Sequence, residues 1–251
     1  MWVAAAAVPS RPGLRALLFL PGVFAPAVVA LWLAARAEGR EGTRALLERL
    51  FQWRVDVRWY VFAAGYMAAI KLAVAVVHRA AIDAWPQFGT EALYLIPFAI
   101  AVSTVVQAGE EIGWRGHALP RLAARLGLAR ASLVLGVVWA FWHLPLFYIA
   151  GTDTTGQSFP FYLLQVTALS VAIAWLYGHT GGSLPLVMLM HAAINNTAGI
   201  VPSAVPDATQ PLALSASLVG WLTLALLWMG AGYFLLRMPK TDLSPSPAAA
   251  P

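Results

Sequence analysis

Seven long apolar runs, separated by short segments rich in arginine, account for most of this 251-residue chain. They lie at about 14–35, 57–78, 92–114, 131–150, 159–178, 183–200 and 212–236. A helix needs about 20 residues to cross the ~30 Å hydrocarbon core of a bilayer, and each run crosses it or nearly does. The runs therefore predict an all-α fold, a polytopic transmembrane helical bundle with about seven spans.

The composition agrees with this class of protein. Hydrophobic residues make up 60% of the chain and charged residues only 11%, against roughly 45–50% and about 25% in soluble domains. The net charge of +5 could suggest a nucleic-acid partner, but the basic residues lie in the gaps between apolar runs. We therefore expect a lipid bilayer and no nucleic acid. The absence of cysteine excludes disulfides, thiolate nucleophiles and Cys-ligated metals.

The chain reads as one domain. We expect a single transmembrane helical domain over 14–238, with the chemically interesting polar residues in its core at about 92–200. The first 13 residues predict a flexible N-terminus, and the Pro/Ala/Ser-rich stretch 239–251 predicts a disordered tail.

The basic residues predict the orientation. Seven spans with the N-terminus outside place twelve of them on the cytoplasmic side, as the positive-inside rule requires. These are Arg36, Arg40, Arg44, Arg49, Arg54, Arg58, Arg115, Arg121, Arg125, Arg130, Arg237 and Lys240. On that side, 41–53 and 117–126 have apolar residues at helical spacing, which predicts one or two interfacial amphipathic helices. The Ala/Arg-rich usage favours a bacterial inner membrane, with the C-terminus cytoplasmic.

Several polar side chains interrupt the apolar runs. The third run carries Glu110, Glu111 and Arg115, the fourth His143, and the sixth His191 and Asn195. Ionisable residues inside a membrane are costly, so each is a candidate functional residue. Lys71 stands alone in the second run, and we expect it to snorkel or to pair locally.

A depth estimate tests whether these residues can meet. At 1.5 Å per residue, His143 lies about 18 Å from the cytoplasmic start of its run, His191 about 12 Å and Asn195 about 18 Å. Glu110 descends from the outer face and lies about 27 Å across. All four fall in the middle to cytoplasmic half of the membrane.

Helical spacing separates the side chains by face. His191 and Asn195 are four residues apart and project from one face. Glu111 and Arg115 have the favourable acid-first i, i+4 order. Since Glu110 and Glu111 are about 100° apart on a helix, the simplest assignment pairs Glu111 with Arg115 and leaves Glu110 for chemistry.

Three short motifs thus follow one another on three separate runs. They are Glu110-Glu111-x-x-x-Arg115, Trp139-x-x-x-His143 and His191-x-x-x-Asn195. This ordered set, over about 110–195, resembles the CAAX-protease and bacteriocin-processing (CPBP, or Abi) family of intramembrane endopeptidases. The family pattern more often has Phe at the position of Trp139, so we expect altered packing there rather than lost chemistry.

The resemblance implies hydrolysis of peptide bonds, which needs an activated water, a proton donor and stabilisation of the oxyanion. The implied roles are general base for Glu110, water binding for His143, oxyanion hydrogen bonding for His191 and Asn195, and structural support for Glu111, Arg115 and Trp139. The partner would be a peptide or protein substrate in or at the membrane, either a prenylated C-terminal peptide or a bacteriocin precursor or other small protein.

Two points stay open at the level of sequence. Glu110, His143 and His191 also form a His₂Glu set of the kind that binds catalytic zinc, although the HExxH signature is absent. We favour glutamate chemistry with no cofactor, and a divalent metal such as zinc is the alternative. Intramembrane Glu and His also suit a proton-coupled transporter, and a non-catalytic membrane scaffold of the same fold is a further alternative.

Overall fold

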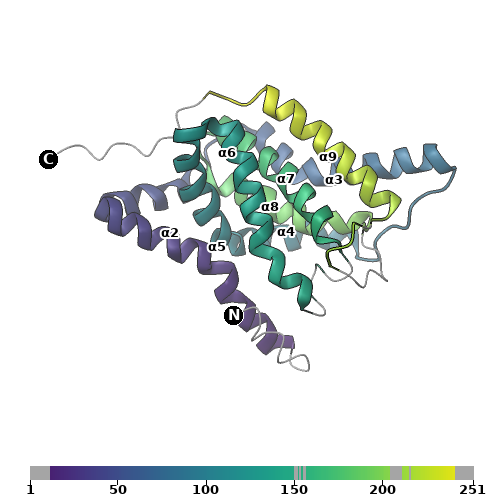
Figure 1. Ribbon diagram of the computed structural model, residues 1–251, viewed down its shortest axis with the longest axis horizontal. Helices are drawn as coiled ribbons and strands as arrows, with labels where there is room; N and C mark the ends of the chain where they lie inside the picture. The colour runs from purple at the N-terminus through teal and green to yellow at the C-terminus, as the bar shows by residue number, and fades with distance from the viewer. Residues whose placement is uncertain are drawn as a thin grey trace.

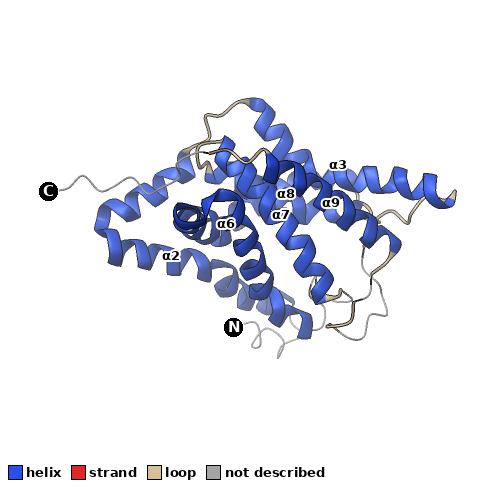
Figure 2. Cartoon of the chain, turned by 45° about the horizontal axis from the view of Figure 1, so that its top comes forward, coloured by secondary structure: helices blue, strands red, loops and turns tan. Residues whose placement is uncertain are grey.

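The computed structural model describes residues 12–149, 152, 154, 157–203, 211–214 and 216–240, and the regular elements in those ranges are all helical (Figures 1 and 2). The all-α fold class is therefore confirmed. Most of the predicted flexible N-terminus and almost all of the predicted tail lie outside the described residues. The first helix already begins at Pro12.

In the described ranges, eight α-helices and one π-helix build the bundle. In chain order these are α2 (Pro12–Glu48), α3 (Val57–Ile82), α4 (Ile96–Val106), α5 (Ala108–Glu111), the π-helix η3 (Ile112–Ala118), α6 (Leu119–His143), α7 (Phe159–His179), α8 (Leu184–Thr197) and α9 (Leu218–Leu236). Short 3₁₀ turns follow or precede them at Arg49–Phe51, Leu93–Leu95, Leu144–Tyr148 and Ala198–Ile200.

Within the described ranges, five helical segments are long and apolar enough to cross a membrane. They are Phe19–Phe51, Val57–Ile82, Leu93–Tyr148, Phe159–His179 and Leu218–Leu236, and Leu184–Ile200 is a shorter apolar helix. A helix pairs its backbone N–H and C=O groups within itself and can therefore span lipid. This pattern of long apolar helices is that of an integral membrane protein.

The third and fourth predicted spans differ from the expectation of two separate helices. Both lie in the single segment Leu93–Tyr148, which has 56 residues and would be about 84 Å long if it were straight. The segment is instead interrupted by the π-helix η3 and by Gly127, whose φ of 74° is left-handed. The seven-span count stays a prediction.

Two left-handed glycines also set off the predicted amphipathic segments. Gly39 (φ 65°) breaks α2 before the stretch predicted at 41–53, and Gly127 ends the first part of α6, which contains most of 117–126. Glycine carries no Cβ, so it adopts this conformation at little cost. The location of both segments at the membrane surface stays a prediction.

Helices α7 and α8 lie in the middle of the bundle. In the most apolar 18-residue window of α7, 67% of the residues are buried, against 28% in α2. Helix α7 packs against α6 and α9, while α8 packs against α3 and α4, an arrangement that Figure 1 shows around the central pair. Helix α2, in contrast, contacts mainly α5 and η3.

The start of each central helix has the same local chemistry. The Ser158 and Ser183 hydroxyls accept hydrogen bonds from backbone N–H groups in the first turns of α7 and α8, and a proline follows two residues after each serine. A serine cap satisfies an N–H that has no helical partner, and a proline in the first turn has no N–H to satisfy. The Ser183 cap fixes where α8 begins, and this sets the position of His191 along the helix.

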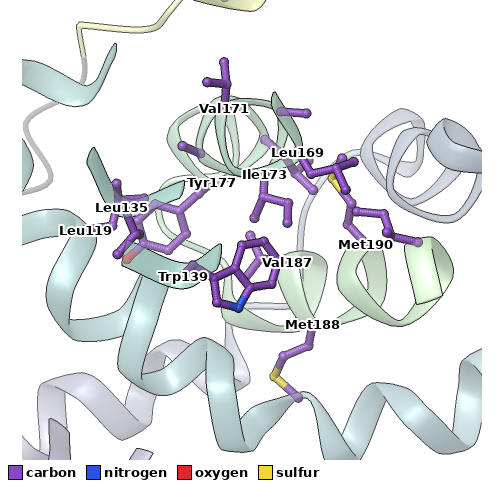
Figure 3. Close-up of a cluster of buried hydrophobic side chains, with 14 of the residues drawn as sticks. Leu119, Leu135, Trp139, Leu169, Val171, Ile173, Tyr177, Val187, Met188 and Met190 are labelled. Atoms are coloured by element: carbon purple, nitrogen blue, oxygen red, sulfur yellow. The ribbon is translucent and has the colours of Figure 1, made fainter. Parts of the chain in front are cut away.

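The apolar core joins α6, α7 and α8. Figure 3 shows Trp139 of α6 among Ile173 and Tyr177 of α7 and Val187 and Met188 of α8. Trp139 is only 4% exposed. The core therefore holds the large indole of Trp139 firmly in place, and this indole also borders the site described next.

Candidate active site

The two adjacent glutamates lie on a short stretch of helix that packs tightly against α2. Glu110 and Glu111 end α5 and are 7% and 0% exposed. They are flanked by Gly109 and Gly113, and a Cβ atom built on Gly113 would lie only 2.5 Å from the Cβ of Pro26. The small residues permit the close approach of two helices that is common in membranes. Helix α2 therefore helps to fix the position of both carboxylates.

Glu110 is held by indole groups at one of its two oxygens. The Trp139 Nε1–H donates to Glu110 Oε2 at 2.7 Å, and the Trp114 Nε1–H donates to the same oxygen at 3.3 Å. The other oxygen, Oε1, lies 3.9 Å from His143 Nε2. The carboxylate thus has one occupied side and one side that faces the imidazole.

The hydrogen bond of His143 to the backbone defines its chemistry. Its Nδ1 lies 2.9 Å from the carbonyl oxygen of Trp139. A carbonyl only accepts hydrogen bonds, so Nδ1 carries the proton and Nε2 of the neutral ring is an acceptor. The 3.9 Å between Nε2 and Glu110 Oε1 is too long for a direct hydrogen bond. The gap suits a water molecule that donates to both.

Glu111 belongs to a separate, fully buried charge cluster. Its Oε1 accepts from Arg115 Nη1 at 2.8 Å and from His191 Nδ1 at 2.8 Å. Arg115 is 0% exposed and His191 is 4% exposed. Breaking such a pair on one side would leave an uncompensated buried charge. The bond between Glu111 and His191 therefore connects the helix that carries Glu110 to α8, and Arg115 pairs with Glu111 within that same helical stretch.

Trp139 lies between the two clusters. The Arg115 guanidinium carbon lies 4.2 Å from the centroid of its ring. The His191 ring packs edge-on against Trp139 with centroids 5.1 Å apart, and the His143 ring does so at 5.9 Å. Arg115, His143 and His191 also all interact electrostatically with Glu110. The side chains of the three sequence motifs therefore converge on one location.

The two asparagines of α8 have different surroundings. Asn196 donates through its amide to the Ser103 hydroxyl on α4 and to the carbonyl of Ala192, both at 2.8 Å. Asn195 is exposed, and within the part of the chain that the structure describes its side chain has no hydrogen bond to the other motif residues. Asn196 thus joins two helices, while the Asn195 amide stays available.

Lys71 lies outside this site. It is 2% exposed, and its ammonium group donates to Ser203 Oγ at 2.6 Å and to Thr223 Oγ1 at 3.3 Å. It therefore pairs locally rather than snorkelling, and it ties α3 to α9 and to the segment that follows α8.

Two features of the site were not predicted from the sequence. One is Trp114, whose only signal is its position one helical turn after Glu110. The other is the pair Gly109 and Gly113, whose four-residue spacing is typical of close helix packing in membranes. A phenylalanine at position 139 could not make the hydrogen bond that the Trp139 indole makes to Glu110, so this departure from the family pattern changes more than packing.

The candidate metal ligands Glu110, His143 and His191 do not form a ligand group in this structure. Among the described residues, no group of three or more His, Asp or Glu side chains is arranged to hold a metal ion. His191 directs its Nδ1 to Glu111, which is already paired with Arg115. A metal-ligating histidine commonly donates its other ring N–H to a carboxylate in this way, so this contact leaves the Nε2 of His191 free.

Two comparisons with known proteins bear on the family to which this chain is similar. The family model described as "Type II CAAX prenyl endopeptidase Rce1-like" matches residues 92–197, a range that contains every motif residue. A curated relative, "CAAX prenyl protease 2" of Methanococcus maripaludis, is 24% identical over 198 residues, which cover 73% of this chain and 72% of the relative.

Both matches support the resemblance to the CAAX-protease and bacteriocin-processing (CPBP) family. The all-helical fold and the order of the three motifs along the chain agree with that resemblance. The family model extends from just before the 3₁₀ turn that precedes α4 to the end of α8. Helices α2, α3 and α9 lie outside it.

Proposed function

We propose that this chain is an intramembrane endopeptidase in which Glu110 and His143 activate a water molecule. The observation that carries the proposal is the 3.9 Å approach of Glu110 Oε1 to His143 Nε2. These are two acceptors, brought together from different helices, in a largely buried location. Two acceptors at this separation bind one water through both of its hydrogens and point its lone pairs at a third group.

The reaction follows from this placement. The water oxygen attacks the carbonyl carbon of a peptide bond while Glu110 takes a proton. The C–O bond forms and the carbonyl π electrons move to its oxygen. Glu110 then returns the proton to the leaving nitrogen as the oxyanion re-forms the C=O bond and the C–N bond breaks, giving a carboxylic acid and an amine. The remaining proton from water then passes from the acid to the amine, which leaves a carboxylate and an ammonium group. One carboxyl group thus acts first as base and then as acid.

His191 and Asn195 are proposed to stabilise the oxyanion. The Nδ1–H of His191 is directed at Glu111, so a hydrogen bond from Nε2 requires the doubly protonated ring. With that charge, the two glutamates are balanced by Arg115 and His191. The amide of Asn195, one turn further along α8, supplies a second donor. Preorganised donors of this kind supply a large part of the rate enhancement in acyl transfer.

We propose glutamate chemistry without a metal. The geometry that supports this is that, among the residues the structure describes, no group of three or more His, Asp or Glu side chains is placed to hold a metal ion. Exhaustive chelation, with metal content measured in the same sample, tests this part. Loss of cleavage on chelation and its return on adding Zn²⁺ would refute the metal-free chemistry.

A cleavage assay in detergent tests the proposal as a whole. Glu110→Gln and His143→Ala are expected to abolish cleavage of a peptide substrate. Glu48→Gln is the matched control, because the same chemical change falls on an exposed side chain that pairs only with Arg44. If wild-type protein in vesicles takes up a solute in a Glu110-dependent manner and cuts no peptide, the protein is a transporter and the proposal is wrong.

The substrate and the orientation belong to the same proposal. The curated relative is named CAAX prenyl protease 2, so matched peptides with and without a C-terminal prenyl group are the first pair of substrates to compare.

The orientation is tested by labelling. The chain has no cysteine, so single introduced cysteines report topology directly. With the N-terminus outside, a membrane-impermeant maleimide should label Asp83→Cys in intact cells, and should label Thr43→Cys only after permeabilisation.

A further inference from the structure

Two tryptophans contact the proposed general base, and a third contacts one of them. Trp139 and Trp114 both direct their indole N–H groups to Glu110 Oε2, at 2.7 Å and 3.3 Å. Trp142 lies against Trp114 with ring centroids 5.9 Å apart. Its Nε1 is buried and has no hydrogen-bond partner among the described residues.

Both donors fall on one oxygen of the carboxylate. An indole N–H only donates, and hydrogen bonds to an ionised oxygen are stronger than neutral ones. Fixing Oε2 also fixes the rotation of the carboxyl group about its last bond, which otherwise turns freely over a broad range. The direction of Oε1 toward His143 therefore depends on the two indoles.

The Trp139 indole is rigid enough for this task. It is buried in the core between α6, α7 and α8 (Figure 3). The Arg115 guanidinium covers its face, and the His191 ring meets it edge-on. A group that positions a reacting side chain must itself be locked by its surroundings, and Trp139 meets this condition.

We propose that Trp139 and Trp114 are positioning residues that hold Glu110 Oε2, so that Oε1 is the oxygen that takes the proton from water. This inference rests on the proposed endopeptidase function. Neither indole touches the reacting atoms. Because Trp114 is one turn from Glu110 on the same helix and Trp139 belongs to the His143 helix, the pair also ties the base to the imidazole that shares its water.

An isosteric replacement tests the role of the N–H group alone. At position 139, 3-benzothienylalanine keeps the bicyclic shape and puts sulfur in place of the N–H. We expect kcat to fall about 10- to 100-fold, since a small misplacement of a reacting group has costs of this size, with KM and the thermal unfolding midpoint unchanged. At position 114, where the bond is longer, the same replacement should lower kcat less.

Trp142 is the matched control. The same analogue at position 142 removes an N–H that has no partner in the described structure and keeps the packing on Trp114, so kcat should not change. An equal loss of kcat at 139 and 142 would show a general packing effect and would overturn the inference. A full kcat with the analogue at 139 would also overturn it.

A spectroscopic measurement without substrate separates this inference from the proposed function. In protein labelled with ¹⁵N at the indoles, Glu110→Gln should shift the Nε1–H resonances of Trp139 and Trp114 and leave that of Trp142 in place. Unshifted resonances at 139 and 114 would refute the hydrogen bonds themselves. Shifted resonances together with full proteolysis by Glu110→Gln would instead refute Glu110 as the base, so the two failures are distinguishable.

Discussion

Glu110 and Glu111 are adjacent in the sequence, yet they belong to two different kinds of buried site. Glu111 is closed: the Arg115 guanidinium and the His191 ring bond directly to one of its oxygens, and it is 0% exposed. Glu110 is 7% exposed, bonds only neutral indoles, and keeps one oxygen turned to an imidazole that it does not touch.

Under the proposed function, this difference is how the protein keeps one carboxylate structural and another reactive on one turn of helix. A buried charge costs several kcal/mol unless it is paired and hydrogen-bonded. Glu111 offsets that cost at Oε1, which contacts both Arg115 and His191, while its Oε2 is buried with no hydrogen-bond partner among the described residues. Glu110 accepts hydrogen bonds from two neutral indole N–H groups, both at Oε2. Its Oε1 lies 3.9 Å from His143 Nε2, and in the proposed mechanism this oxygen exchanges a proton with water. The approximately 100° turn between neighbouring helical residues makes the division possible.

The largest expected effect contrasts function at the two positions. Glu110→Gln should lower kcat by about 10³-fold, which is within the usual range for loss of a general acid–base group. Its free energy of unfolding in an SDS titration should change little, because the amide oxygen still accepts from the indoles of Trp139 and Trp114. A Glu110→Gln variant that unfolds easily would show that both glutamates are structural and would remove the contrast.

The next effect concerns stability at Glu111. Glu111→Leu leaves Arg115 charged and buried, so it should lower the free energy of unfolding by about 3–5 kcal/mol. The double variant Glu111→Leu/Arg115→Leu should recover much of that loss, since no buried charge is then left without its partner. If the losses of the two single variants simply add in the double variant, the ion pair is not the source of the stability.

The asparagines of α8 sharpen the contrast between reactive and structural groups. Asn195→Ala removes a proposed oxyanion donor from an exposed position, so kcat should fall about 10²-fold or more with stability unchanged. Asn196→Ala removes the bond to Ser103 and should cost about 0.6 kcal/mol of stability with cleavage retained. If Asn196→Ala instead lowers kcat and Asn195→Ala lowers only stability, the oxyanion donor is Asn196 and not Asn195.

Much of this organisation can be read from the sequence, since spacing decides it locally. The i, i+4 order of Glu111 and Arg115 predicts their ion pair, and the length of the apolar runs predicts a helical membrane bundle. Both follow from the period of a helix and the thickness of lipid, so they require no knowledge of how the helices pack.

The remainder depends on packing between segments that are far apart in the chain. Nothing in the sequence shows that His191 pairs with Glu111 rather than facing Glu110, because that depends on how α8 is rotated against α5. Trp139, whose indole donates a hydrogen bond to Glu110, lies 29 residues away from it in the sequence. The merging of two predicted spans into Leu93–Tyr148 arises because the intervening residues continue as a π-helix and a kinked helix instead of a loop.

The last prediction tests whether α2 positions both glutamates together. In Gly113→Ala the new Cβ would lie 2.6 Å from the backbone of Pro26, so α2 and the π-helix must separate, at a cost of about 1–3 kcal/mol. Gly232→Ala is the matched control, because a Cβ there meets nothing within 4 Å, and replacing a helical glycine by alanine should be neutral or stabilising by up to about 1 kcal/mol. If the Gly113→Ala separation moves the short helix as a unit, kcat and stability should fall together, unlike in the variants at Glu110 and Glu111. A loss of stability with unchanged kcat would mean that Glu110 is held by the two indoles alone and that α2 supports only the Glu111 cluster.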